Sequence, residues 1–181
     1  MGKLFVISGS SGVGKGTVIK EFLKRNPEFK LSVSCTTRQP REGEIDGINY
    51  FFLSKEKFKD CIEKEEFLEW AEFSGNMYGT QRAYVEEKLA LGKNLILEID
   101  TKGALNVKKI MPDATLIFIL PPSFEELEAR LRGRHTETEE AIQKRLESTK
   151  LEMENSKLFD FQVINDSIDN AVFSLEKIMK E

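Results

Sequence analysis

The stretch that decides the fold reads Leu4-Phe5-Val6-Ile7-Ser8-Gly9-Ser10-Ser11-Gly12-Val13-Gly14-Lys15-Gly16-Thr17. Residues 4–8 form an apolar run typical of a buried strand, and residues 15–25 have helical spacing that stops at Asn26-Pro27. Glycines between a strand and a helix leave backbone N–H groups uncovered, and the helix dipole there favours anions. We therefore interpret the stretch as a P-loop in which Lys15 reaches the β- and γ-phosphates of a nucleotide. The candidate phosphate-binding residues are Gly9, Ser10, Ser11, Gly12, Val13, Gly14, Lys15, Gly16 and Thr17.

Magnesium is the cofactor expected beside such a loop, although this loop departs from the strict motif. Position 16 is Gly, where the motif has a Ser or Thr that helps to hold Mg²⁺, and Thr17 comes one residue later. The apolar run 95–99 carries carboxylates at Glu98 and Asp100, at the strand end where P-loop proteins place a ligand of Mg²⁺ or of its water shell. Thr17 and Asp100 are the candidate metal-shell residues, while the alternative for Asp100 is that it only starts a turn. The pattern does not decide between Glu98 and Asp100.

Composition predicts a soluble cytoplasmic protein of one domain. The chain has 181 residues, of which 40% are hydrophobic and 32% charged, and no apolar run approaches the ~20 residues of a membrane span. A net charge of −4 argues against a general nucleic-acid binder. Cys35 and Cys61 have no CxxC spacing, so we expect reduced thiols. Because His135 is the single histidine, neither a His-based catalytic triad nor a His-rich metal site can be built.

The rest of the chain alternates strand and helix patterns. Further strands are expected at 94–99, 114–120 and 161–164, with helices at 81–91 and 101–111, another opening at Ser123, and a last one whose apolar face carries Ile168, Ala171, Val172, Leu175 and Ile178. This alternation predicts an α/β fold with a parallel sheet covered by helices on both faces. Two stretches, 34–80 and 130–140, break the rhythm, and we expect them to be insertions around the core.

Two arginines lie three residues apart in the segment Ser34-Cys35-Thr36-Thr37-Arg38-Gln39-Pro40-Arg41-Glu42-Gly43-Glu44. Pro40 excludes a helix there, so the segment is extended or turned. The guanidinium groups of Arg38 and Arg41 suit an anion such as a phosphate, although a solvated basic loop explains the same residues equally well.

From end to end the sequence resembles the guanylate kinases. The shared elements are residues 8–17, residues 36–44, Phe67 to Gly79, Ile99-Asp100, Pro121-Pro122-Ser123, Arg134 with residues 136–140, and Val163-Ile164-Asn165-Asp166. The elements Arg-x-Pro-Arg-x-Gly-Glu and Gly-Asn-x-Tyr-Gly are far more specific than a P-loop alone. The resemblance implies a three-layer P-loop fold in one domain, with a core at 1–33, 81–125 and 146–181, a GMP-binding insertion at 34–80 and a short lid at 126–145.

The resemblance also implies roles for individual residues. The acceptor phosphate would be held by Arg38, Arg41, Tyr50 and Tyr78, and guanine would be read by Ser34, Glu69 and Thr80, with Asp100 nearby. The candidate catalytic set would be Lys15 and Arg38 with Arg130, Arg134 and Arg145, which approach the ATP phosphates when the lid closes; Asn165 would lie near adenine. Chemistry supports the guanine assignment, because a carboxylate can accept from N1–H and the 2-amino group of guanine but faces an acceptor at N1 of adenine. Without the resemblance, Glu69 would be interpreted as an exposed strand glutamate.

The implied function is reversible transfer of the ATP γ-phosphoryl group to GMP, giving ADP and GDP, in purine nucleotide metabolism. The acceptor phosphate is already anionic near neutrality because its second pKa is about 6, so alignment and charge neutralisation replace a general base. Two alternatives are a non-catalytic guanylate-kinase-like module that binds phosphopeptides and a P-loop kinase that acts on a sugar phosphate. The expected partners are ATP and GMP, without nucleic acid or membrane; the sequence does not separate GMP from dGMP or indicate an oligomeric state.

Overall fold

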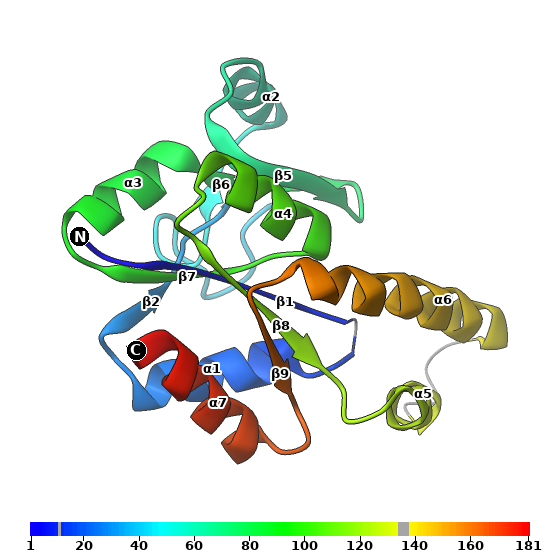
Figure 1. Ribbon diagram of the computed structural model, residues 1–181. Coiled ribbons are helices and arrows are strands. Elements are labelled where there is room, and N and C mark those ends of the chain that lie inside the picture. The colour runs from blue at the N-terminus through cyan, green and yellow to red at the C-terminus, as the bar shows by residue number, and fades with distance from the viewer. Residues whose placement is uncertain (11, 134–137) are drawn as a thin grey trace. The chain divides into compact units, whose positions relative to one another are not determined.

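The structure, a computed structural model, describes residues 1–10, 12–133 and 138–181. Contacts along the chain divide it into two units, whose elements are labelled in Figure 1. The first unit comprises residues 1–4, 28–97 and 102–114, and the second comprises residues 5–27, 98–101 and 115–181.

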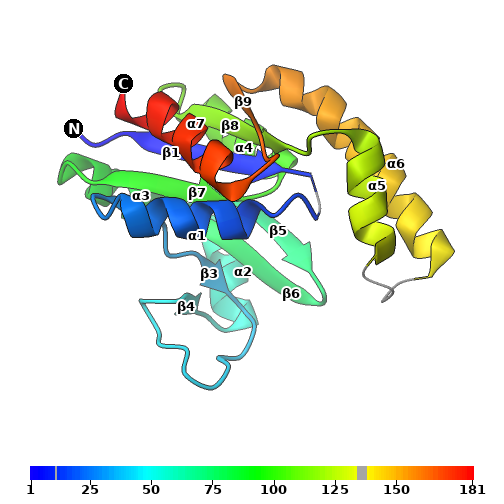
Figure 2. The ribbon, with the colours of Figure 1, turned by 90° about the horizontal axis from the view of Figure 1, so that it is seen from below.

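Parallel strands form the sheet of the second unit. They are β1 (Leu4–Gly9), β8 (Thr115–Leu120) and β9 (Phe161–Ile164), and β8 pairs with each of the other two. Helices α1 (Lys15–Arg25) and α7 (Ile168–Lys180) lie side by side on one face of these strands (Figures 1 and 2), because each buries apolar residues three or four positions apart. The bounds of α1 and β9 are those predicted from the sequence. Met179, rather than Ile178, continues the buried face of α7.

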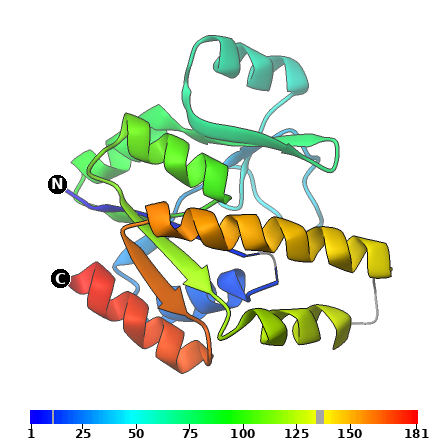
Figure 3. The same cartoon turned by 45° about the vertical axis from the view of Figure 1, so that its right-hand side comes forward.

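Two further helices of the second unit pack against each other, as Figure 3 shows. They are α5 (Phe124–Gly133) and α6 (Glu139–Asn155), with the 3-10 turn η1 (Ser156–Leu158) after α6, and their shared core is Leu127, Leu131, Ile142 and Leu146. The sequence pattern does not predict α6, because the apolar residues on its buried face are few and charged residues surround them. The helix runs across residue 145, where the sequence places the end of a lid.

A four-stranded sheet is the main feature of the first unit. Its order is β4 (Phe51–Phe52), β3 (Cys35–Thr36), β6 (Asn76–Gln81) and β5 (Phe67–Phe73), with β6 antiparallel to both of its neighbours. Helix α2 (Lys55–Glu63) packs on this sheet around a core of Cys35, Phe58, Cys61, Phe67 and Met77. The remaining elements are the parallel pair β2 (Phe29–Leu31) and β7 (Asn94–Glu98), with α3 (Arg82–Ala90) and α4 (Thr101–Ile110).

The strand pairings confirm the predicted α/β class. β1 with β8, β8 with β9, and β2 with β7 are all parallel, and helices separate these strands along the chain. The four-stranded sheet and α2 fall within residues 34–80, the first stretch that breaks the alternation in the sequence, except that β6 extends one residue further to Gln81. Among the residues that the structure describes, no helix is long and apolar enough to cross a membrane.

Candidate active site

The P-loop connects β1 to α1 in the second unit, as the sequence predicts. Gly12 and Gly14 have φ angles of 78° and 86°, a left-handed conformation that glycine adopts without strain. A Cβ atom at Gly9 would lie 2.9 Å from the carbonyl oxygen of Ile119, so the loop needs a glycine there too. No side chain caps α1 at Gly14, which leaves the N–H groups of its first turn open to an anion.

Lys15 begins α1 and is half-buried. Burial lowers the pKa of its ammonium group, while the carboxylates of Glu98, Glu152 and Asp100 raise it. Glu98 also faces the loop, because a Cβ at Gly16 would lie 3.5 Å from its Oε1 atom. Carboxylates at the end of a strand therefore surround the lysine, as the sequence predicts, but Glu152 on α6 is a neighbour that the sequence does not reveal.

The possible metal ligands beside the P-loop suit Mg²⁺, which takes few ligands from the protein, better than a metal whose ligands all come from protein side chains. Among the described residues, no group of three or more His, Cys, Asp or Glu side chains has the geometry of a metal site. Mg²⁺ commonly uses only one or two carboxylates, because substrate phosphates and waters fill its remaining positions. Glu98 near Gly16 offers such a carboxylate, and Thr17 and Asp100 are exposed.

Asn165 follows β9 and touches the P-loop directly. The residue is 7% exposed, and its Nδ2 atom donates a hydrogen bond to the carbonyl oxygen of Val13 at 2.7 Å. The resemblance implies a place near adenine for this residue, whereas the observed partner is the backbone of the loop.

A second group of predicted residues converges in the first unit around Arg38. Its two terminal nitrogens donate to the two carboxylate oxygens of Glu44 at 3.0 and 2.8 Å. The guanidinium also lies 5.4 Å from the ring centre of Tyr50, and the Tyr50 and Tyr78 rings meet edge to face at 6.2 Å. A hydrogen bond to Tyr78 adds to the effect of Glu44 in raising the pKa of Arg38. Arg41 is exposed and forms no ion pair with any residue the structure describes.

Glu44 is the residue of this group whose part the sequence analysis misses. It accepts from the backbone N–H of Arg41 at 2.7 Å as well as from Arg38. Hydrogen bonds from the Arg38 side chain and the Arg41 backbone hold the pKa of the Glu44 carboxyl at about 2. Its signal in the sequence is the last position of the element Arg-x-Pro-Arg-x-Gly-Glu, which begins at Arg38.

The loop that carries these residues is fixed by its own side chains. Met77 donates its N–H to the Thr37 hydroxyl at 2.9 Å, which ties the start of the loop to β6. Asp46 accepts from the N–H of Phe52 at 2.9 Å, and Asn49 accepts from the N–H of Ile45 at 2.8 Å. These hydrogen bonds fix both ends of the loop, while residues 39–43 between them are exposed.

Glu69 and Thr80 lie opposite each other on β5 and β6. A bulge between Phe67 and Glu69 shifts the register of β5 and places Glu69 opposite Thr80. Glu69 is buried to 9% exposure, and Thr80 donates its hydroxyl to Glu69 Oε1 at 2.7 Å. Ser34, the third predicted guanine-reading residue, precedes β3 and accepts through its carbonyl from the N–H of Phe51 at 2.9 Å. The interpretation of Glu69 as an exposed glutamate is thus excluded.

The predicted lid arginines lie on α5 and α6. Arg130 pairs with Glu126 at 2.7 Å, and Arg132, which the sequence does not assign to the site, pairs with Glu128 and Glu139. Arg145 is half-buried on α6, in the same unit as the P-loop. Arg134 and Ser11 lie outside the described residues.

Both cysteines are free and buried in the small core beneath β3 and α2. Burial raises the pKa of the Cys35 thiol to about 12 and also raises that of Cys61. Thiols of this kind are poor nucleophiles at neutral pH, so neither is a candidate catalytic group.

A glycine-rich loop between β1 and α1, with Lys15 at the start of the helix, places the chain in the class of P-loop α/β proteins. The family model named guanylate kinase matches residues 1–181. A guanylate kinase of Prochlorococcus marinus is 55% identical over 177 residues, covering 98% of this chain and 96% of the relative. One from Synechocystis sp. is 51% identical over 180 residues, covering 99% and 94%. The chain therefore belongs to the guanylate kinase family.

Solved structures agree with this placement. The crystal structure of guanylate kinase from Anaplasma phagocytophilum matches with a TM-score of 0.74 and 30% identity, covering 99% of this chain and 85% of that one. Shikimate kinase from Bacteroides thetaiotaomicron matches with a TM-score of 0.54 at 13% identity, covering 99% of both chains, which is a likeness of fold alone.

Proposed function

We propose that this protein transfers the γ-phosphoryl group of ATP reversibly to GMP, giving ADP and GDP. The observation that best supports this reaction is the buried pair of Glu69 and Thr80, which lies on the same four-stranded sheet as the Arg38 cluster. A carboxylate that reads a base and a guanidinium that binds a phosphate are together what a nucleoside monophosphate requires.

The acceptor phosphate would bind at Arg38. Glu44 takes one edge of the guanidinium through its two terminal nitrogens, which fixes the plane of the group. An arginine has five N–H donors, and the Gln39 carbonyl oxygen accepts a third one from Nη1 at 2.9 Å, so the phosphate oxygens would bind on the Nε side of the group together with Tyr78. The hydroxyl of Tyr78, the neighbouring ring of Tyr50 and the exposed Arg41 would complete this phosphate site.

Guanine would bind at Glu69. A carboxylate offers roughly four lone-pair positions, so Glu69 can hold the Thr80 hydroxyl and also accept from the N1–H and 2-amino groups of the base. Adenine has no donor at N1 and would leave a buried carboxylate facing an acceptor, which disfavours AMP. Ser34 and Asp100 remain predicted contributors to this site.

On the donor side, the uncapped N–H groups of α1 and the ammonium of Lys15 would bind the phosphates of ATP. Mg²⁺ would be held by the phosphates together with Thr17 and a carboxylate at Glu98 or Asp100, and when bound it would neutralise charge between the two nucleotides. Arg130, Arg134 and Arg145 would add positive charge around the transferring group, whose transition state spreads negative charge over its equatorial oxygens.

A coupled assay of ADP release tests this function with GMP, dGMP, AMP, CMP, UMP and ribose 5-phosphate as acceptors. We expect turnover with GMP, and at least ~100-fold lower kcat/KM with AMP because a base edge of the wrong polarity leaves a buried group unpaired. Turnover with ribose 5-phosphate alone would favour a sugar-phosphate kinase. Binding of GMP without ADP release would favour the phosphopeptide-binding module instead.

The finer parts of the sequence interpretation stay predictions. They are the division into a core, an insertion at 34–80 and a lid at 126–145, and the location of the protein in the cytoplasm. We also propose that the reaction uses Mg²⁺, and chelation of the metal in the ADP-release assay tests this directly.

A further inference from the structure

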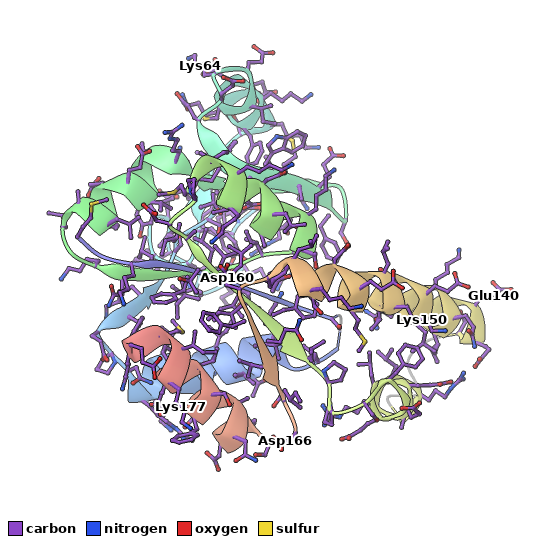
Figure 4. The ribbon with its side chains drawn as sticks, viewed as in Figure 1. Lys64, Glu140, Lys150, Asp160, Asp166 and Lys177 are labelled. Carbon is purple, nitrogen blue, oxygen red and sulfur yellow. The ribbon has the colours of Figure 1, made fainter. Side chains whose placement is uncertain are left out.

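Asn165 lies at the turn between β9 and α7, one residue before Asp166, which Figure 4 labels at that turn. The backbone N–H of Asn165 donates to the carbonyl oxygen of Leu120, at the end of β8, at 2.8 Å. The residue is therefore anchored to the sheet, and only 7% of its surface is exposed. An amide buried this deeply needs partners inside the protein.

The side chain of Asn165 finds its partner in the P-loop. Its Nδ2 atom lies 2.7 Å from the carbonyl oxygen of Val13, and a Cβ at Gly14 would come within 3.1 Å of the same nitrogen. Val13 is 1% exposed, so its carbonyl has little access to water. Without Asn165 this buried acceptor would lose its partner, which favours a rearrangement of the loop.

Because of the geometry of the peptide bond, the contact between Asn165 and the Val13 carbonyl also fixes the direction of the Gly14 N–H. The Val13 carbonyl and the Gly14 N–H belong to one peptide unit, which is planar and trans, so the two groups point in opposite directions. Holding the carbonyl toward Asn165 therefore points the Gly14 N–H away from it. Gly14 is exposed and left-handed, the conformation in which successive N–H groups form an anion-binding nest.

We propose that Asn165 is a positioning residue of the P-loop, which aims the Gly14 N–H at the phosphates of the donor nucleotide by holding the Val13 carbonyl. One N–H of its amide is committed to the loop in this way. This inference rests on the proposed function only in taking ATP and ADP as the ligands of the P-loop.

The test compares Asn165→Ala with a matched control, Asn26→Ala. Asn26 is 1% exposed in the same unit, and its Nδ2 donates to the carbonyl of Phe22 at 2.9 Å, but it caps the far end of α1. Small displacements of a binding group can cost up to about 100-fold, so we expect Asn165→Ala to raise the Kd of ADP and the KM of ATP by at least tenfold. The KM of GMP should change less than twofold. Asn26→Ala should lower the melting temperature and leave the Kd of ADP within twofold.

A second variant, Asn165→Asp, keeps the shape of the side chain and makes the effect depend on pH. Above neutrality its carboxylate would face the Val13 carbonyl, two acceptors in contact, and ADP binding should be weak. Burial raises the pKa of a carboxyl group, so at pH 5.5 the protonated Asp can donate to Val13 again. The charged groups of the adjoining segments are Lys15 and Asp166, and the Asp166 carboxylate is engaged by Ser167 N–H at 2.6 Å and by the Asn170 amide at 3.2 Å.

The expected result is that the ratio of Kd for ADP between Asn165→Asp and wild type falls at least tenfold from pH 8 to pH 5.5, as the lost hydrogen bond returns. An unchanged ratio, or an Asn165→Ala protein that binds ADP as tightly as wild type, would overturn the positioning role alone. Wild-type protein that fails to bind ADP would overturn the proposed function and this inference with it. If Asn165→Ala does not fold, the pH series of Asn165→Asp decides the question.

Discussion

The contact between Glu69 and Thr80 depends on one irregularity in β5. The bulge between Phe67 and Glu69 brings the Glu69 carboxylate opposite Thr80, so the hydroxyl can hold one of its oxygens. In a regular strand Glu69 would share a face with Phe67, and Leu68 would lie on the opposite face; all three residues are buried here, so both faces of β5 are covered at this point. The bulge thus decides which residue of β6 lies opposite the buried Glu69 carboxylate, and that residue is Thr80.

Glu69→Gln should therefore change specificity and leave the fold intact. The amide keeps an oxygen for Thr80 but sets an NH₂ donor against the donor face of guanine, and the lost hydrogen bond should lower kcat/KM for GMP by roughly 30- to 1000-fold. Discrimination against AMP should shrink, because the amide can donate to adenine N1. The measurement is kcat/KM for both acceptors, with Glu72→Gln, an exposed site on the same strand, as control. An unchanged GMP-to-AMP ratio would show that Glu69 does not read the base.

The ion pair of Arg38 and Glu44 should give the protein a stability that depends on pH. The folded protein holds the pKa of Glu44 at about 2, below the ordinary value of 4.5, mainly through the hydrogen bond from Arg38. A carboxyl group whose pKa is lowered by folding stabilises the folded state above its unfolded pKa, and this contribution disappears as pH falls through the folded pKa.

Glu44→Gln should accordingly melt below wild type at pH 7 and at pH 5, and the difference should narrow between pH 4.5 and pH 2, the interval between the two pKa values. Thermal melts across this range provide the test, with the exposed neighbour Glu42→Gln as control. A difference that stays constant down to pH 2 would mean that the Glu44 charge does not stabilise the fold.

Contacts between residues far apart in sequence limit what the sequence predicts at this scale. Arg38 and Glu69 could be predicted as site residues because the resemblance to a known family assigns them roles. The role of Glu44 could not be predicted, since it depends on the hydrogen bonds that Glu44 accepts from the Arg38 side chain and the Arg41 backbone. Asn165 shows the limit more clearly, because a side chain 152 positions from Val13 cannot be paired with it by spacing.

At the scale of elements, the packing of α2 against the β5–β6 hairpin explains why position 79 is a glycine. A Cβ at Gly79 would lie 3.1 Å from the Glu69 carbonyl oxygen and equally close to atoms of the Phe58 and Phe67 rings. The hairpin and α2 can approach this closely only when position 79 lacks a side chain. Gly79 is also the last residue of the element Gly-Asn-x-Tyr-Gly, so that element has a packing reason besides its tyrosine.

Gly79→Ala should destabilise the protein by about 1–3 kcal/mol, as overpacking of a filled core does. Because the hairpin carries Glu69 and Thr80, the KM of GMP should rise while the KM of ATP stays the same. Chemical denaturation and steady-state kinetics measure these effects. Phe67→Leu in the same protein should restore part of the lost stability by making room for the added methyl group. Failure of this rescue would argue that the strain arises elsewhere.

The sequence predicts helices and strands that have a strong apolar periodicity, and it does not predict α2 and α6. α1 has the expected bounds because its apolar residues follow the helix period closely. β9 has the expected bounds as well, although Val163 is the one buried residue of its four. α2 and α6 carry many charges, and each buries only a few residues, so their helices depend on packing partners that the local sequence does not show.

At the scale of the whole molecule, the chain divides into units that are not continuous in sequence. The first unit gathers three separate segments, and the second gathers another three. Composition and linkers reveal boundaries only where the chain crosses between units once, so a division made by repeated crossings could not be predicted.

This division predicts that the two substrates protect different amides from hydrogen exchange. A ligand that binds the folded state suppresses local opening around its site. GMP should slow exchange in β3, β6 and residues 38–50, whereas ADP should slow it in the P-loop and the first turn of α1. Mass spectrometry of peptides from each unit measures both effects, with AMP as the control for GMP. Protection of the P-loop by GMP alone would contradict the assignment of the two sites.

The buried cysteines allow the opening of the first unit to be measured in the wild-type protein. Cys35 follows Ser34 directly and lies with Cys61 in the core beneath β3, and burial raises the pKa of both thiols. A thiol-specific dye can reach them only when the sheet opens away from α2, so the rate of labelling measures how often the unlabelled, wild-type protein opens there. A nucleotide that closes this sheet would be detected as slower colour development, without any engineered probe.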